Sequence, residues 1–441
     1  MNMFFCNKLD NDLKYILVEN NCIETCSIIV SVNVGSINEK NYESGISHFL
    51  EHMVFKGTNK YKELDLIEEF EKNGITFNAS TDKDVTKYYA KTNQKYIETC
   101  LDLFSEMLFK SIFPSSEFGK EKNVVIEEYN KDYDDASEYI DELLTPKIFH
   151  KNVMGNSVIG TKKSIMAIQR KDLINYYNKY YNPNNMTLAI VGKYNKKKVE
   201  KLIKQYFSVN NKNKIYDKMT PFFSNQNKIN KIISIRKNAQ TNIQIAFPVF
   251  SERHKDYNAL NIACYIFGSG MSSRLFSVVR EKYGLVYSIG CDLNIYKYGG
   301  NISISAGLDS KNLIPALNLI VSEILKIKKN GFTDYEIKKA KINLETELLI
   351  MNEDTDALAD YYVNELNYDK IISLKNLINK NNLISLKDIN IAFNKYFDFN
   401  KMNIGIIGNL NNNIKNNILK IQNQYDFKNK TKKIKRIFNQ K

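Results

Sequence analysis

Apolar residues occur along the chain in two patterns, short runs of strand length and longer stretches at helical spacing. The short runs are rich in β-branched residues, which pack well in pleated sheets. They are Leu13–Glu19, Thr25–Val34, Asn242–Phe247 and Val286–Leu293. The helical stretches are Gln94–Lys110, Ser116–Leu144 with a candidate break near Asp134, Tyr257–Phe267 and Asp334–Met351. Strands early in each half followed by helices predict an α+β fold with mainly antiparallel sheets packed with helices.

The pattern also repeats within the chain. Tyr177–Asn195 matches Phe393–Asn411 after a shift of 216 residues, and Gly192 and Gly408 are among the identical positions. Both copies have the pattern of a helix end, a buried strand and a glycine turn that opens another helix. A single repeat of this length indicates a duplicated domain. We therefore predict two homologous halves, residues 1–210 and 232–441, which form a clamshell and are joined by a polar linker at 211–231.

Composition places the chain among ordinary soluble globular proteins. Of its 441 residues, 43% are hydrophobic and 25% are charged, and no uninterrupted apolar stretch approaches the roughly 18 residues of a membrane span. Met1–Asp10 lacks the pattern of a secretory signal or of an Arg-rich transit peptide. The six cysteines are scattered without paired spacing, which favours free thiols in a reducing compartment. We therefore expect a cytoplasmic protein with no membrane partner.

The net charge of +14 raises the question of nucleic-acid binding. The excess is almost entirely lysine and is spread along the chain, with local density only in the tail from Lys428 to Lys441. Such a tail is typical of a solvated chain end. We therefore expect no nucleic-acid partner.

Two of the four histidines lie within one short segment, His48-Phe49-Leu50-Glu51-His52. Residues four apart lie on the same face of a helix, so both imidazoles can reach one metal ion. Glu51 lies beside that ion without having to bind it, where a carboxylate can act as general base on an activated water. A surface helix with two unrelated histidines is the alternative. We predict a catalytic metal site with Glu51 as the base.

A catalytic zinc site needs a third protein ligand, which should come from another helix. Glu121 and Glu128 are seven residues apart and share a helix face, whereas Glu127 points elsewhere. By pattern alone, an ordinary solvated acidic helix is the better interpretation of this segment.

The repeat predicts that only one half carries the metal site. The shift of 216 residues places Cys264, Phe267 and Gly268 at the positions of the two histidines and the glutamate of the motif. Neighbouring apolar positions match in kind, so the second half keeps the helix and lacks the chemistry.

The motif, followed by Phe55-Lys56-Gly57-Thr58, resembles the H-x-x-E-H segment of the pitrilysin/insulinase family of inverted zincins. The resemblance covers essentially the whole chain and is closest to the short bacterial branch that is similar to mitochondrial processing peptidase. It implies one Zn²⁺ per chain, bound by His48, His52 and Glu128. It also implies that Glu121 is a supporting carboxylate that orients a ligating histidine.

The same resemblance implies further site residues. Arg280 and Tyr287 match a pair that holds the substrate over the zinc in this family. Asn78, Ala79 and Ser80 resemble the family's edge strand, which can add an extended peptide to the sheet.

An acidic segment follows the third ligand, and Glu138 and Glu142 share a helix face within it. Such a patch would attract basic peptides by its local field, and the family's processing peptidases favour arginine near the cleaved bond. Acids that only solvate a helix are the alternative. His150 and His254 are expected outside the site.

We therefore predict a zinc metalloendopeptidase that hydrolyses peptide bonds in short or unstructured polypeptides. A non-catalytic subunit, or one partner of a heterodimer, is the alternative within the same family. The chain carries the complete zinc motif together with the Arg280/Tyr287 pair, which favours a self-sufficient enzyme that forms a homodimer.

Overall fold

The computed structural model describes residues 4–150, 152–210, 220–237, 240–368 and 370–421. The chain forms two compact units, each assembled from three segments. Unit 1 comprises Met1–Tyr129, Asn156–Lys218 and Thr346–Leu377, and unit 2 comprises Asn130–Gly155, Met219–Glu345 and Ile378–Lys441. Part of the predicted linker, 211–219, and the basic tail from 422 onward lie outside the described residues.

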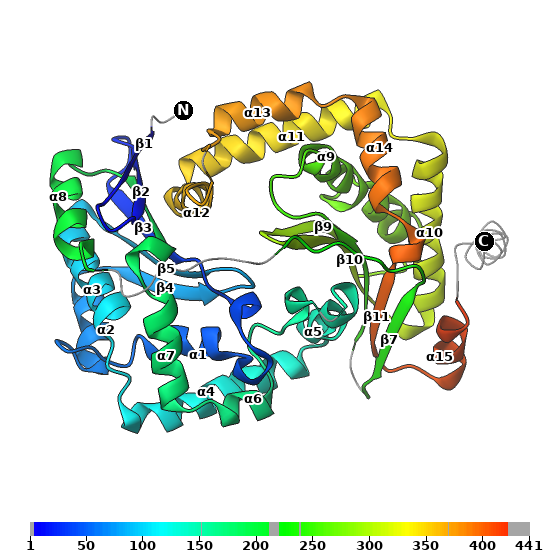
Figure 1. Ribbon diagram of the computed structural model, residues 1–441. Helices are drawn as coiled ribbons and strands as arrows, with labels where there is room; N and C mark the ends of the chain where they lie inside the picture. The colour runs from blue at the N-terminus through cyan, green and yellow to red at the C-terminus, as the bar shows by residue number, and fades with distance from the viewer. Residues whose placement is uncertain (1–3, 151, 211–219, 238–239, 369, 422–441) are drawn as a thin grey trace. The chain divides into compact units, whose positions relative to one another are not determined.

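Unit 1 is built on a six-stranded sheet with the order β1-β2-β6-β3-β5-β4. The strands are β1 (Phe4–Lys8), β2 (Lys14–Glu19), β3 (Thr25–Val32), β4 (Thr76–Thr81), β5 (Thr86–Asn93) and β6 (Met186–Gly192). Neighbouring strands are antiparallel except β2 and β6, which are parallel. β1 and β4 are therefore the edge strands of this sheet (Figure 1).

Both faces of the unit 1 sheet are covered, which explains why β2 and β3 are apolar without strict alternation. Leu17 and Val30 point into a core that includes residues of several helices of the first half. These are α1 (Ile46–Met53), α2 (Glu63–Lys72), α3 (Ile97–Lys110), α4 (Ser115–Asp134), α7 (Arg170–Tyr180) and α8 (Lys196–Phe207), with the short α6 (Lys162–Ala167). Ile16 and Val18 lie on the opposite face, against α12 (Thr355–Glu365) from the second half of the chain.

Unit 2 is built on a five-stranded sheet with the order β7-β11-β8-β10-β9. The strands are β7 (Asn230–Ile235), β8 (Thr241–Val249), β9 (Ser288–Tyr296), β10 (Gly299–Leu308) and β11 (Asn403–Gly408). The helices of the second half other than α12 are α9 (Tyr257–Gly268), α10 (Leu313–Asn330), α11 (Asp334–Glu353), α13 (Leu374–Leu383), α14 (Leu386–Tyr396) and α15 (Asn412–Leu419). One face of this sheet is covered by α5 (Ala136–Ile148), which comes from the first half of the chain. Gly405 on β11 leaves room for the side chain of Ile140 on that face.

The two sheets have the same internal plan. In unit 1, β6 lies between a parallel and an antiparallel neighbour, and β11 has the same two kinds of neighbour in unit 2. The order β2-β6-β3-β5-β4 corresponds strand by strand to β7-β11-β8-β10-β9. Helix α5 follows the long helix α4, and α12 follows the equivalent long helix α11. These two helices are exchanged between the halves, since each packs on the sheet of the other half.

The predicted α+β class is confirmed, with two mostly antiparallel sheets. The segment Ser116–Leu144 is divided as the pattern suggested, since α4 ends at Asp134. Asp135 then begins α5 by accepting a hydrogen bond from the Ser137 amide. None of the described helices combines the length and the apolar character that crossing a lipid bilayer requires.

Candidate active site

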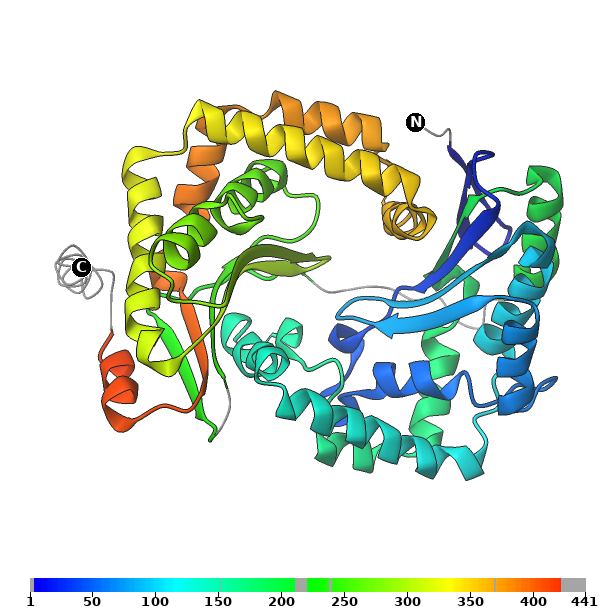
Figure 2. The ribbon, with the colours of Figure 1, turned by 180° about the vertical axis from the view of Figure 1, so that it is seen from behind.

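The predicted metal motif lies on α1, as the spacing required. Gly45 precedes the helix with a φ of 91°, a left-handed conformation that suits glycine. Phe49, Leu50 and Met53 are buried in the unit 1 core. This packing turns the opposite face, with the two histidines, toward α4, which runs beside α1 in both views (Figures 1 and 2).

His48, His52 and Glu128 come together at one point. Their ligand atoms all lie within 4.8 Å of one another, and theirs is the one such His/Cys/Asp/Glu group found among the described residues. Glu128 Oε2 is 3.6 Å from His48 Nε2 and 3.5 Å from His52 Nε2. Two atoms that are each about 2.0–2.2 Å from a tetrahedral zinc ion lie roughly 3.4 Å apart. The donor set and its spacing therefore fit zinc.

Glu121 holds the ring of His52. The Nδ1–H of His52 donates to Glu121 Oε1 at 2.8 Å, and Lys56 Nζ lies 2.8 Å from Glu121 Oε2. Burial lowers the pKa of His52, but the carboxylates of Glu121 and Glu128 outweigh it and raise that pKa to about 9. The contact with Glu121 therefore orients the ring so that Nε2 faces Glu128, and the role of Glu121 in supporting a metal ligand stays a prediction.

His48 is held differently. Its Nδ1 is buried and hydrogen-bonds to none of the described residues. Burial, with a smaller contribution from His52, lowers the pKa of His48 to about 4. The ring is therefore neutral near pH 7, which is the form that binds a metal ion.

Glu51 lies on the same helix and is nearly buried. Thr81 Oγ1, at the end of β4, donates a hydrogen bond to Glu51 Oε2 at 2.5 Å. Burial raises the pKa of Glu51, and the Thr81 hydrogen bond opposes that rise. A carboxyl group with a raised pKa is suited to taking up and returning a proton. Thr81 directly follows the predicted edge-strand residues Asn78, Ala79 and Ser80, but its contact with Glu51 is not visible in the sequence pattern.

β4 runs along the edge of the sheet beside Glu51. It pairs with β5 through Asn78–Tyr89, Ala79–Tyr88 and Ser80–Lys87, and no described strand pairs with its outer edge. Asn78 and Ser80 are exposed there. The backbone of this edge is therefore open to an additional extended chain.

Two models of one peptidase family cover most of the chain. "Insulinase (Peptidase family M16)" matches residues 15–162, and "Peptidase M16 inactive domain" matches residues 167–344. The chain belongs to peptidase family M16. The model of the inactive domain matches the half in which Cys264, Phe267 and Gly268 replace the metal motif.

Relatives of this M16 peptidase match it over most of its length. An uncharacterized zinc protease of Bacillus subtilis, YmxG, is 29% identical over 382 residues, which are 86% of this chain and 92% of that protein. An uncharacterized zinc protease of Rickettsia felis is 29% identical over 353 residues, 79% of this chain and 84% of that one.

Solved structures show the same fold. A protease from Helicobacter pylori superposes with a TM-score of 0.87 at 24% identity, over 92% of this chain and 100% of that one. The periplasmic protease PqqL from Escherichia coli superposes with a TM-score of 0.78 at 20% identity, over 98% of this chain and 50% of that one.

The remaining predicted site residues of the M16 peptidase lie in unit 2. Arg280 is exposed on η6 (Phe276–Lys282), with its guanidinium over the ring of Phe276, and Tyr287 is 64% exposed just before β9. Glu138 and Glu142 lie on α5, a separate helix from the one that carries Glu128. Their closeness to the metal ligands therefore stays a prediction.

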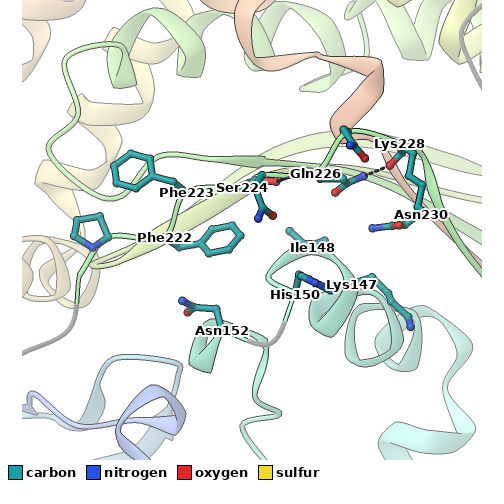
Figure 3. Close-up of a pocket in the computed structure, with 13 residues that line it drawn as sticks. Lys147, Ile148, His150, Asn152, Phe222, Phe223, Ser224, Gln226, Lys228 and Asn230 are labelled. Carbon is teal, nitrogen blue, oxygen red and sulfur yellow. Dashed lines mark hydrogen bonds between the residues drawn. The ribbon is translucent and has the colours of Figure 1, made fainter.

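The other two histidines have different surroundings. His254 stacks on Phe250 with ring centroids 4.3 Å apart. His150 lines a cavity of about 430 Å³ in unit 2, between the end of α5 and the segment that leads into β7 (Figure 3). Lys147, Phe222 and Gln226 also line this cavity, which contains none of the predicted catalytic residues.

Proposed function

We propose that this M16 zinc protease binds one Zn²⁺ per chain through His48, His52 and Glu128. We further propose that it hydrolyses peptide bonds in short or unstructured polypeptides, with Glu51 as general base. The observation that carries this proposal is the convergence of two imidazole nitrogens and one carboxylate oxygen within 4.8 Å, next to a buried carboxyl group on the same helix. Zinc, when bound, supplies Lewis-acid polarisation of a water molecule and of the scissile carbonyl.

Glu51 performs the proton transfers of this mechanism. Its carboxylate takes a proton from the attacking water and later gives it to the leaving amine. The hydrogen bond from Thr81 fixes the carboxylate beside the metal ligands. Because Thr81 is the last residue of β4, the same strand can bind the substrate and hold the base.

The open edge of β4 is the proposed substrate-binding strand. An extended peptide would pair with the backbone around Asn78, Ala79 and Ser80, which reads main chain rather than side chain. Arg280 and Tyr287 are proposed to hold the bound peptide from the second half of the chain. Each is exposed and available to a ligand.

A non-catalytic subunit or a heterodimer partner is the competing function within the family. Such chains are expected to lack part of the metal motif or the Arg/Tyr pair, and this chain has both. We therefore propose a catalytically complete chain that acts as a homodimer.

Metal analysis combined with peptide digestion tests the proposal. Wild type should contain one zinc per chain and cleave an unstructured peptide, and a chelator should abolish both. His52→Ala and Glu128→Gln should lose the metal, whereas Glu127→Gln, an exposed neighbour on the same helix, should keep it. Full zinc occupancy in His52→Ala would refute the ligand assignment.

Substrate preference is a finer part of the proposal. Glu138 and Glu142 lie on one face of α5 and would favour basic peptides by their local field. The test compares kcat/KM for matched peptides with Arg or Glu before the scissile bond, at low and high salt. A preference for Arg should shrink with salt, since exposed charges are screened over about 10 Å at 0.1 M. A preference that is unchanged in Glu138→Gln/Glu142→Gln would contradict the role of this pair.

A further inference from the structure

The first turn of α1 has no cap of its own. Its N-cap residue, Gly45, has no side chain, so the amide groups at the start of the helix need acceptors from elsewhere. Glu39 provides them from the preceding loop. Its Oε2 accepts from the Gly45 amide at 2.8 Å and its Oε1 from the Ser47 amide at 2.9 Å. The side chain of Glu39 is almost completely buried, so water cannot replace these contacts.

Other groups close around the same turn. The hydroxyls of Ser47 and Tyr176 lie 2.9 Å apart, which ties the turn to α7. The backbone at Gly160 approaches so closely that a Cβ there would lie 2.6 Å from the carbonyl oxygen of Ser44. The start of α1 is thus enclosed on several sides, and Glu39 is the one ionisable side chain that hydrogen-bonds to its amides among the described residues.

The two histidine ligands differ in how they are oriented. His52 has a carboxylate on its second ring nitrogen, at 2.8 Å, which is the usual arrangement for a metal-binding histidine. His48 has no such acceptor among the described residues, because its buried Nδ1 is unpartnered. The position of the His48 ring therefore depends on the backbone that carries it. His48 directly follows Ser47, and the backbone amide of Ser47 is fixed by its hydrogen bond to Glu39.

We propose that Glu39 is a positioning residue for the metal site. It fixes the first turn of α1 and, through that turn, the His48 ligand. This inference rests on the proposed function, in which His48 binds zinc. The two amide hydrogen bonds fix the turn, because they supply the acceptors that the helix start otherwise lacks.

The test uses the full-length protein and the variant Glu39→Gln, with Glu43→Gln as the matched control. Glu43 lies in the same loop, but its carboxylate contacts Lys40 rather than α1. Zinc dissociation constants are measured by chelator competition at pH 8.5, since burial raises the pKa of Glu39 to about 8 and the wild-type side chain is then largely ionised. The amide in Glu39→Gln keeps the size but turns a donor toward one of the two amides.

We expect zinc affinity to fall about 10–100-fold in Glu39→Gln, as for other groups that orient metal ligands. kcat at limiting zinc should fall with KM unchanged, and added zinc should restore it. Glu43→Gln should match wild type. A folded Glu39→Gln variant with a wild-type zinc dissociation constant would overturn the inference, even if its thermal stability were reduced.

A second variant and a reference variant complete the design. If Glu39→Gln yields no folded protein, Glu39→Asp is measured in the same way, and a dissociation constant within about twofold of wild type overturns the inference. Glu128→Gln is run in parallel. Zinc loss in Glu128→Gln with unchanged binding in Glu39→Gln removes only the role of Glu39. Unchanged binding in Glu128→Gln removes the ligand set and the inference with it.

Discussion

Glu121 offers the most direct quantitative test of how this site is built. Its two oxygens have different partners, with His52 Nδ1 at 2.8 Å from Oε1 and Lys56 Nζ at 2.8 Å from Oε2. The variant Glu121→Gln replaces one acceptor by a donor. In either orientation of the amide, an NH₂ group faces either the imidazole N–H or the ammonium group. One buried contact therefore becomes donor against donor.

The expected decrease in zinc affinity follows from the loss of that contact. Groups that orient metal ligands typically change metal affinity about 10–100-fold when they are substituted. This corresponds to about 1.4–2.7 kcal/mol of zinc binding energy, at about 1.36 kcal/mol for each factor of ten. Lys56→Met leaves the contact between His52 and Glu121 in place and should have the smaller effect.

The assay is chelator competition at fixed pH on wild type, Glu121→Gln and Glu117→Gln. Glu117 lies one turn earlier on α4 and pairs with Lys120, so it is a matched control without contact to His52. Zinc binding in Glu121→Gln within about twofold of wild type would show that Glu121 does not support the His52 ligand. So would an equal loss in Glu117→Gln, because the effect would then be general to the helix.

Three further predictions follow from the same structure. Glu51→Gln should bind zinc and peptide normally but lose about 10²–10⁴-fold in kcat, because an amide cannot take the proton from water; wild-type turnover of this variant would contradict the mechanism. Burial raises the pKa of Glu39 from 4.5 to about 8, so the folded protein is more stable with this carboxyl protonated than with it ionised. Relative to Glu39→Gln, wild type should therefore lose stability, on the order of a few kcal/mol, as pH rises through this window. Urea unfolding of both proteins at pH 5, 7 and 9 checks this direction. A difference in unfolding free energy between wild type and Glu39→Gln that does not change with pH would contradict the prediction. Leu358→Ala on α12 should cost about 2–5 kcal/mol and speed amide exchange in β6 of unit 1 more than in β8 of unit 2, since Leu358 packs in a core with Val191. An effect confined to β8 would contradict the exchange of helices.

The exchange of α5 and α12 determines how a truncated protein is expected to behave. A fragment of residues 1–210 contains the whole zinc motif and all six strands of the first sheet. It lacks α12, however, and so exposes Ile16, Val18 and Ile29, which that helix covers. Large exposed apolar patches favour aggregation. The predicted boundary at 210 follows the repeat in the sequence, whereas the compact units follow the packing.

Much of the candidate site could be predicted from local pattern. The placement of His48 and His52 on one helix face depends only on the helical repeat, and the burial of Phe49 and Leu50 turns that face toward α4. The strand segments were recognisable because β-branched runs suit a sheet that is covered on both sides. The division of Ser116–Leu144 was visible as well, since Asp135 is a good N-cap residue.

Glu128 could not be assigned from local pattern, because an acidic helix has no internal feature that distinguishes a metal ligand from a solvated carboxylate. Family resemblance selected this residue, and only the packing of α4 beside α1 brings its Oε2 to 3.5 Å from His52. The hydrogen bond from Thr81 to Glu51 depends on the pairing of β4 with β5. The two amide contacts of Glu39 depend on how the preceding loop folds back to the first turn of α1.

The sequence by itself thus determined elements that local periodicity controls, namely the helix with its two imidazoles, the strands β2, β3, β6, β8, β9 and β11, and the duplication, whereas β1, β5, β7 and β10 were not predicted. The tertiary structure decided which distant carboxylates approach that helix and which sheet each of the exchanged helices covers. The physical reason is that side-chain spacing along one helix is set by backbone geometry, which operates over a few residues. Contacts between elements depend instead on how apolar faces are buried together, and many sequences of similar pattern satisfy that condition equally well.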